Sequence, residues 1–181
     1  ESIDYGGILL DTRNDGRTGI LFLATPRGIQ YDAVQDDATG SENSSPDFYW
    51  DAAGKITRDG WVLEIRIPFS SLRYSGGGSQ VWGIQLFRNY PREFRYEMFS
   101  ARHPRGGSCF VCRNNPLTGL DGLPTGDHFV VAPYASAERT SAPRDGPGTP
   151  LVASATEFTG GVDAKWVPSP DNALDMTVNP D

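Results

Sequence analysis

A strict alternation of apolar and polar side chains over residues 61–67 constrains the fold of this chain more than any other feature. Trp61, Leu63 and Ile65 would point to one side of an extended strand, and Glu64 and Arg66 to the other. Pro68 ends this strand, and residues 69–74 suit a single helical turn. Similar runs, bounded by turn residues, predict strands at 7–11, 19–24, 29–34, 48–56, 81–90 and 94–100. Residues 102–126 are rich in Pro, Gly and Asn and are expected to form a loop.

Frequent helix breakers favour an all-β fold. The 21 glycines and 14 prolines make up about a fifth of the 181 residues, well above their usual share. They leave little room for long helices, and no apolar run approaches the roughly 18 residues that a membrane-spanning helix requires. The net charge of −7 argues against nucleic acid as a partner, because no basic stripe is present to bind phosphates. It also argues against peripheral binding to anionic lipid.

The tail, residues 128–181, has a pattern of its own. A strand is predicted at 129–137, followed by a loop at 140–150. Residues 159–167 and 174–178 alternate, with Val162 and Trp166 on one face and Asp163 and Lys165 on the other. Two such strands joined by a short polar turn are typical of an outer-membrane β-barrel hairpin, although an amphipathic hairpin of a soluble protein has the same pattern. Because a lone hairpin is marginally stable, the tail is expected to need partners beyond these strands.

Two cysteines, Cys109 and Cys112, are the only ones in the chain. They are too few for a four-ligand zinc site, since His103 and His128 lack finger-like spacing. No strand–helix–strand context suggests a redox dithiol, and nothing nearby supports catalysis by Cys109 with His128. The pair is expected to form a small local disulfide or to remain as two reduced thiols in a loop. An oxidised pair would suit an exported protein.

Several phrases, taken in order, resemble one family of proteins. The two most specific are Asp59-Gly-Trp-Val-Leu-Glu-Ile-Arg-Ile-Pro-Phe69 and Leu174-Asp-Met-Thr-Val-Asn-Pro-Asp181. Supporting phrases lie at 10–15, 19–22, 71–74, 82–84, 133–134 and 161–165. Together they resemble the bacterial outer-membrane proteins that join a β-sandwich similar to carbohydrate-binding modules of family nine to a β-barrel of unknown function. The resemblance covers almost the whole chain.

This resemblance implies an architecture and a location. Residues 1–127 would form an immunoglobulin-like or jelly-roll-type β-sandwich of the family-nine type that lacks its first strands and the signal peptide. Residues 128–181 would form the first strands of an outer-membrane barrel. The expected location is the bacterial outer membrane, with the sandwich either periplasmic or surface-exposed. The partners would be a saccharide, the rest of the protein's own barrel and the membrane.

A saccharide site needs aromatic faces beside groups that bind hydroxyl pairs. The outward faces of the predicted strands, together with the start of the strand at 48–56, supply candidates: Tyr49, Trp50, Glu64, Arg66, Gln85 and Asn89. The alternative for Glu64 and Arg66 is a cross-strand ion pair on a solvated face. Trp61 and Trp82 fall on the same strand face as aliphatic neighbours and are assigned to the core, whereas Trp50 could belong either to the core or to the saccharide site.

Calcium is a candidate cofactor, because family-nine-like modules are similar to known calcium-containing sandwiches. Two acidic clusters could supply oxygen ligands: Asp11, Asn14 and Asp15, and Asp32, Asp36 and Asp37. The first cluster is not an EF-hand, because the twelfth loop position falls on Phe22 rather than on a glutamate. Turn formation by itself would also explain Asp and Asn at these positions. The sequence therefore leaves the metal open.

The sequence favours a non-catalytic binding protein. A glycosidase needs two facing carboxylates, and no spacing singles out a pair among Glu64, Glu93 and Glu97. The nucleophile elbow, phosphate-binding loop and zinc-protease motifs do not occur in the sequence. The expected function is glycan binding in a cell-envelope protein. The first alternative is a structural or plug-like domain of the barrel without a sugar ligand, and the second is part of a glycan-degrading hydrolase.

Overall fold

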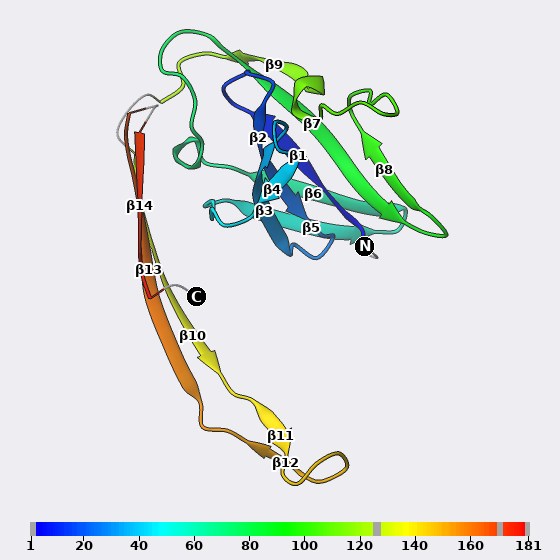
Figure 1. The fold of residues 1–181 in the computed structure, drawn as a ribbon, viewed down its shortest axis with the longest axis vertical. Coiled ribbons are helices and arrows are strands. Elements are labelled where there is room, and N and C mark those ends of the chain that lie inside the picture. The colour runs from blue at the N-terminus through cyan, green and yellow to red at the C-terminus, as the bar shows by residue number, and fades with distance from the viewer. Residues whose placement is uncertain (1–2, 125–127, 170–171, 180–181) are drawn as a thin grey trace. The chain divides into compact units, whose positions relative to one another are not determined.

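The structure, a computed structural model, describes residues 3–124, 128–169 and 172–179. The chain divides into two compact units, residues 1–125 and 126–181. Both are built from antiparallel strands, so the all-β prediction is confirmed (Figure 1). The helices in the described residues are single 3-10 turns, and none of them could span a membrane.

A seven-stranded antiparallel sheet forms the body of the first unit. Its strands follow the order β4-β3-β2-β1-β7-β8, and β9 pairs with β7 on the same edge as β8. The bounds are β1 Tyr5–Asp11, β2 Thr18–Ala24, β3 Gln30–Asp36, β4 Ser41–Asn43, β7 Gln80–Pro91, β8 Arg95–Phe99 and β9 Asn115–Leu120. A separate hairpin consists of β5 Asp51–Thr57 and β6 Gly60–Arg66.

One face of the sheet, here called the hairpin face, packs against the β5–β6 hairpin. Leu10, Phe22 and Trp82 point to this face and form a cluster with Trp50 and Tyr74. The inward side of β6 supplies Leu63 and Ile65, as the alternation of residues 61–67 predicts. The predicted helical turn is the 3-10 turn η1, Phe69–Ser71, which follows directly after Pro68.

The opposite face, here called the loop face, is also covered. Leu9, Leu21 and Ala33 form a second cluster, which is closed by Val111 from an irregular segment. This segment lies within the predicted loop at 102–126, which proves to hold the 3-10 turn η2, Val111–Arg113, and strand β9. The prediction of a plain loop there was wrong, because β7 offers a free edge for β9 and an apolar face for Val111.

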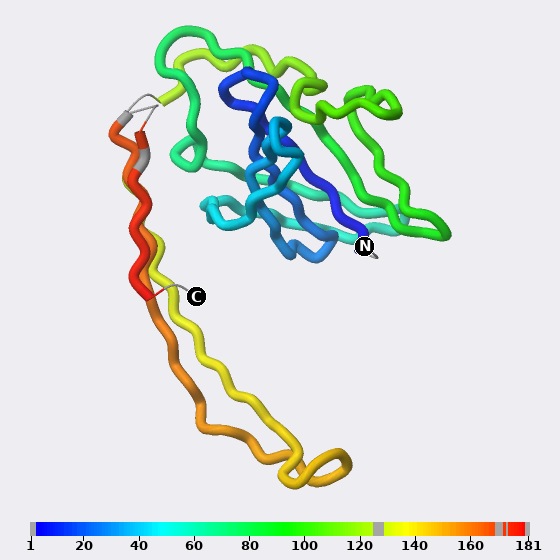
Figure 2. The backbone as a smooth tube through the Cα atoms, viewed as in Figure 1, coloured from blue at the N-terminus to red at the C-terminus, as the bar shows by residue number. Residues whose placement is uncertain are grey.

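The second unit is a three-stranded sheet in the order β10-β13-β14, with β10 His128–Glu138, β13 Glu157–Ser169 and β14 Asn172–Val178. β10 and β13 pair over their whole shared length, as the backbone trace also shows (Figure 2). The predicted loop at 140–150 contains a short strand, β11 Ser141–Pro143, which pairs with β12 Leu151–Ala153. These three strands overlap the predicted strands at 129–137, 159–167 and 174–178, and each extends beyond the predicted bounds.

Candidate functional site

The six residues predicted to bind a saccharide do not share one surface. Glu64 and Arg66 lie on the outer side of the β5–β6 hairpin, where Arg66 Nη1 is 3.7 Å from Asp51 Oδ2. Trp50 is buried on the hairpin face; its Nε1 donates to Asp32 Oδ2 at 2.8 Å, and its ring packs edge-on against Phe22. Tyr49 is exposed beside it.

Gln85 and Asn89 do not face outward, so this part of the prediction was wrong. Their exposed fractions are 0% and 1%. Gln85 Oε1 is 2.6 Å from His103 Nε2. The Asn89 amide donates to the Ile3 carbonyl at 2.7 Å and accepts from Arg95 Nε at 2.8 Å. Both side chains are enclosed because the loop face is covered by chain segments that the alternation of β7 does not reveal.

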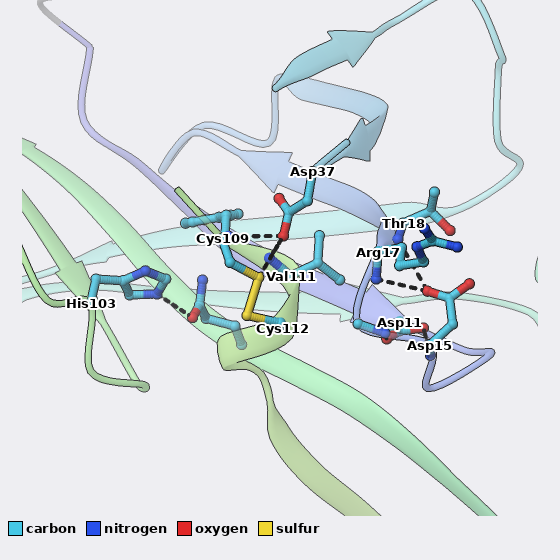
Figure 3. Close-up of a disulfide and its surroundings, with 12 residues drawn as sticks. Asp11, Asp15, Arg17, Thr18, Asp37, His103, Cys109, Val111 and Cys112 are labelled. Atoms are coloured by element: carbon cyan, nitrogen blue, oxygen red, sulfur yellow. Dashed lines mark hydrogen bonds between the residues drawn. A yellow bond between two sulfur atoms is a disulfide. The ribbon is translucent and has the colours of Figure 1, made fainter. Parts of the chain in front are cut away.

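The cover of the loop face is fastened by Asp37, which follows β3. Asp37 Oδ2 accepts the backbone N–H groups of Phe110 at 2.9 Å and Val111 at 2.7 Å (Figure 3). These bonds hold Phe110 and the first residue of η2, Val111, against the sheet, where Val111 is only 1% exposed. Asp37 therefore connects two segments more than 70 residues apart in the chain.

Cys109 and Cys112 form a disulfide within this cover (Figure 3). Cys109 Sγ lies 3.1 Å from the same Asp37 oxygen. A thiolate at this position would lie beside a carboxylate, which is the reverse of the electropositive surroundings that activate redox cysteines. The bridge therefore suits a structural fastening rather than a redox dithiol.

His103 is the second anchor of the cover. Its ring lies 4.6 Å from that of Phe99 and 5.0 Å from that of Phe110, centroid to centroid. Burial lowers the pKa of His103, and the charge of Arg113 lowers it further. The neutral ring is thus favoured, which suits tilted contacts with two phenylalanines and a hydrogen bond to a buried amide.

The carboxylates of the acidic clusters accept hydrogen bonds from other groups of the chain. The Asp11 carboxylate accepts backbone N–H groups of residues 13, 15 and 16, and Asp15 accepts those of residues 17 and 18. Asp32 accepts from Trp50 Nε1 and from the backbone of Phe48. Within residues 3–124, 128–169 and 172–179, no three His, Cys, Asp or Glu side chains are grouped so as to hold a metal ion. The geometry thus favours turn formation, the alternative explanation for these residues.

A different group of side chains lies on the hairpin face at the edge of the β5–β6 hairpin, with Arg92 and Tyr96 exposed and Trp61, Arg88 and Tyr90 half-buried. We call it the arginine–aromatic platform and define it by Trp61, Arg88, Tyr90, Arg92 and Tyr96. The guanidinium carbon of Arg88 lies 4.9 Å from the Trp61 ring centroid and 4.8 Å from that of Tyr90. That of Arg92 lies 4.1 Å from the Tyr90 ring. Rings and cations therefore alternate along the platform, and each contact is a cation–π interaction.

Asp4 fixes one end of this arrangement. Its two carboxylate oxygens accept from Arg88 Nε at 3.0 Å and Nη2 at 2.8 Å, a bidentate pair. The hydrogen bonds that Arg88 donates to Asp4 lower the pKa of Asp4 and raise the pKa of Arg88. Both groups are thus charged at neutral pH, and Arg88 is held in one orientation between its two rings.

The other end of the platform is open. Tyr96 stands opposite Tyr90 in the β7–β8 register, with ring centroids 6.4 Å apart, and it is 51% exposed. Arg92 donates to its own neighbour, the Pro91 carbonyl, and within the described residues no carboxylate forms an ion pair with it. Leu86, Met98 and Phe94 are exposed around these side chains. An exposed ring beside a guanidinium without a carboxylate partner can bind a ligand that is part apolar and part polar.

Sequence reasoning missed the platform, although a signal was present. Arg88 and Tyr90 alternate with Asn89 and so lie on one face of the predicted strand 81–90, and the following aromatic segment 94–100 could have been paired with it. The placement of Tyr96 opposite Tyr90 depends on the turn between the two strands, where the Arg92 N–H donates to the Phe94 carbonyl. Alternation alone does not fix that register.

Comparison with family models, with curated proteins and with solved structures gives no match. The geometry of the two units is therefore the basis on which a function is assigned.

Proposed function

We propose that the first unit binds a glycan at the arginine–aromatic platform without catalysing a reaction, in a bacterial cell-envelope protein. The observation that carries the proposal is the open end of the platform, where the half-exposed Tyr96 ring lies beside the Tyr90–Arg92 stack. Aromatic rings pack against the C–H faces of pyranose sugars, and guanidinium groups donate to neighbouring hydroxyl or carboxylate oxygens. The same unit would be the sandwich of the family-nine type, with the β5–β6 hairpin as its second layer.

Pre-positioning also favours this role. Arg88 is clamped by Asp4 and stacked between Trp61 and Tyr90, so the platform loses little side-chain entropy when a ligand arrives. Glu97, a candidate acid for hydrolysis, is 2.6 Å from Arg95 Nη2 on the other face of β8. Glu97 therefore does not line the platform, which supports binding rather than hydrolysis there.

A second candidate is favoured by the apolar side chains around the platform. Leu86, Phe94 and Met98 are exposed, as is Tyr96, and exposed apolar side chains that gather in one patch often mark a protein contact. In this case the first unit would be a structural or plug-like domain that binds no sugar. The two candidates differ in the role of Arg92, because a glycan needs its donors and an apolar protein contact does not.

The test is calorimetric titration of the protein with a panel of neutral and uronic acid-containing oligosaccharides. Saturable binding is expected, and Tyr96→Ala and Arg92→Ala should each weaken it at least about tenfold, the loss of one stacking or charge-assisted contact. Tyr49→Ala and Arg66→Ala are matched controls, because both residues are exposed away from the platform. Loss of binding in these controls instead would move the site to the outer side of the hairpin. An absence of heat across the panel would favour the structural domain.

We further propose that the second unit contributes strands to a β-barrel in the bacterial outer membrane. The register places Phe129, Trp166 and Leu174 in one cross-strand row and Val131, Ala164 and Met176 in the next row on the same face. This apolar face continues to Phe158, which is 81% exposed. The opposite face carries polar groups, including Lys165 Nζ at 3.4 Å from Asp175 Oδ1.

The length of the apolar face suits a bilayer. From Phe129 to Ala137, β10 extends about 26 Å at roughly 3.3 Å per residue, and when tilted by about 40° it covers about 20 Å of the roughly 25 Å apolar band of an outer-membrane barrel. The test uses outer-membrane vesicles that contain the protein and lipids brominated in their acyl chains. Fluorescence quenching is expected in the wild type and should be lost in Trp166→Phe but retained in Trp82→Phe, whose ring is buried in the first unit. Unquenched wild-type fluorescence would refute the membrane assignment.

A further inference from the structure

The connections at the two ends of the β10-β13-β14 sheet differ greatly in length. β13 and β14 are joined by residues 170 and 171 alone, close to the paired residues Ser169 and Asn172. β10 and β13 are joined by the whole segment 139–156, which includes the β11–β12 hairpin and starts beyond the pair Glu138 and Glu157. The sheet therefore has a short-turn end and a long-loop end.

The length of its connections orients a barrel in the outer membrane. Outer-membrane barrels have short turns on the periplasmic side and longer loops on the extracellular side. If the second unit spans that membrane, the Ser169–Asn172 end is periplasmic and segment 139–156 is extracellular. The exposed side chains of segment 139–156, among them Arg139, Arg144 and Asp145, suit contact with water.

The first unit is connected to the short-turn end. β10 begins at His128, which pairs with Val167, two residues before Ser169. Only residues 125–127 separate His128 from the last described residue of the first unit. Three residues span at most about 11 Å, much less than the roughly 25 Å of an outer-membrane apolar band, so this connection does not cross the membrane.

We infer that the first unit, with its arginine–aromatic platform, lies in the periplasm and takes its ligand from the periplasmic pool of glycans. This inference rests on the proposed function, because it uses both the membrane strands and the platform. The ligand chemistry is a pyranose chain that carries carboxylates, since the exposed Arg92 guanidinium forms no ion pair with a carboxylate of the described residues, although its charge also acts on Asp4. Such chemistry has two sources in this compartment: the peptide-substituted glycan of the cell wall, and soluble oligosaccharides that have passed the outer membrane.

Site-directed labelling tests the orientation in intact cells. Ser141→Cys lies in the long-loop segment and Lys55→Cys on the outer side of the β5–β6 hairpin, and both positions are exposed. The native Cys109 and Cys112 are joined to each other and do not react with maleimide. A maleimide attached to a polymer too large for porins should label Ser141→Cys in intact cells, and Lys55→Cys only after the outer membrane is permeabilised.

Each other outcome has one meaning. Labelling of Lys55→Cys in intact cells would place the first unit outside and overturn the inference while leaving the membrane assignment standing. Labelling of neither variant until permeabilisation would contradict the membrane assignment itself.

For the ligand source, wild-type protein is incubated with purified cell-wall sacculi and, separately, with soluble oligouronates, with Tyr96→Ala as the control. Binding to either that is lost in Tyr96→Ala supports the inference and names the source, and binding to neither overturns it.

Discussion

Replacing Asp37 by alanine should loosen the cover of the loop face more than removing the disulfide does. Each hydrogen bond from a backbone N–H to a carboxylate contributes about 1.5–3 kcal/mol, and Asp37 Oδ2 accepts two of them, from Phe110 and Val111. The other oxygen, Oδ1, is buried without a partner, which offsets about 1–3 kcal/mol of that gain. The expected net loss in Asp37→Ala is therefore about 3 kcal/mol of unfolding free energy.

The disulfide should contribute less, because it closes a very short loop. The chain-entropy relation gives about 2 kcal/mol for a loop of roughly four residues. Cys109 and Cys112 are three positions apart, so this figure applies to their joint replacement by serine. If Asp37 and the disulfide fasten the same segment, the combined variant should lose less than the sum of the two separate losses.

The assay is urea unfolding of the protein followed by tryptophan fluorescence, since Trp50 and Trp82 are buried in the first unit. The urea concentration at the midpoint of unfolding should be highest for the wild type, lower for the cysteine variant and lowest for Asp37→Ala. The dependence of the unfolding free energy on urea concentration should be the same in all three. Asp121→Ala, an exposed aspartate in a loop, is the matched control and should change stability by less than about 0.5 kcal/mol. An Asp37→Ala variant as stable as this control would refute the argument that the carboxylate holds the cover.

Three further predictions follow from the same contacts. His103→Gln should reduce the pH dependence of stability. Burial holds the folded-state pKa of His103 below its ordinary value of 6.5, so the unfolded chain binds more protons than the folded chain as pH falls through that value. The wild type should therefore lose more stability than the variant between about pH 7.5 and about pH 5.5. Asp4→Asn should lower the unfolding free energy by at most about 1 kcal/mol at neutral pH. This loss should vanish in acid, because the stabilisation from the lowered carboxylate pKa is present above the ordinary value of 3.8 and disappears as pH falls through the folded-state pKa. Gly54→Ala should cost about 1–3 kcal/mol in urea unfolding, because the new Cβ would lie 2.3 Å from the Pro26 carbonyl oxygen, whereas Ala53→Ser on the exposed side of β5 should be near neutral.

The strands could be predicted from the sequence because alternation and turn residues are local signals. The run at 61–67 reports directly which side chains of β6 face inward, and Leu63 and Ile65 do so. Alternation does not report what covers the other side of a strand. Gln85 and Asn89 were assigned to an open face because polar residues usually face water, yet Gln85 contacts His103, 18 residues further along the chain, and Asn89 contacts Ile3 and Arg95.

The candidate site was harder to predict because it depends on pairings across the sheet. Tyr96 reaches Tyr90 through the β7–β8 register, and Trp61 reaches Arg88 from a different layer. Neither contact is visible in the spacing of one strand. The expected saccharide residues were chosen strand by strand, and three-dimensional packing separated them: Trp50 entered the core, Arg66 faced outward, and Gln85 went to the opposite face.

The platform is open because the cover of the hairpin face ends at Trp61. Gly6 of β1 makes room for that ring: a Cβ at this position would meet Trp61 Cη2 at 3.0 Å. Beyond Trp61 the hairpin supplies no further side chains in the observed core, while β7 and β8 continue with Arg88, Tyr90 and Tyr96. Leaving rings and aliphatic groups exposed forgoes the roughly 25 cal/mol per Å² that burial would contribute. The exposure of Tyr96 and its aliphatic neighbours therefore does not serve the stability of the sheet, and either the proposed ligand or the alternative protein contact would cover it.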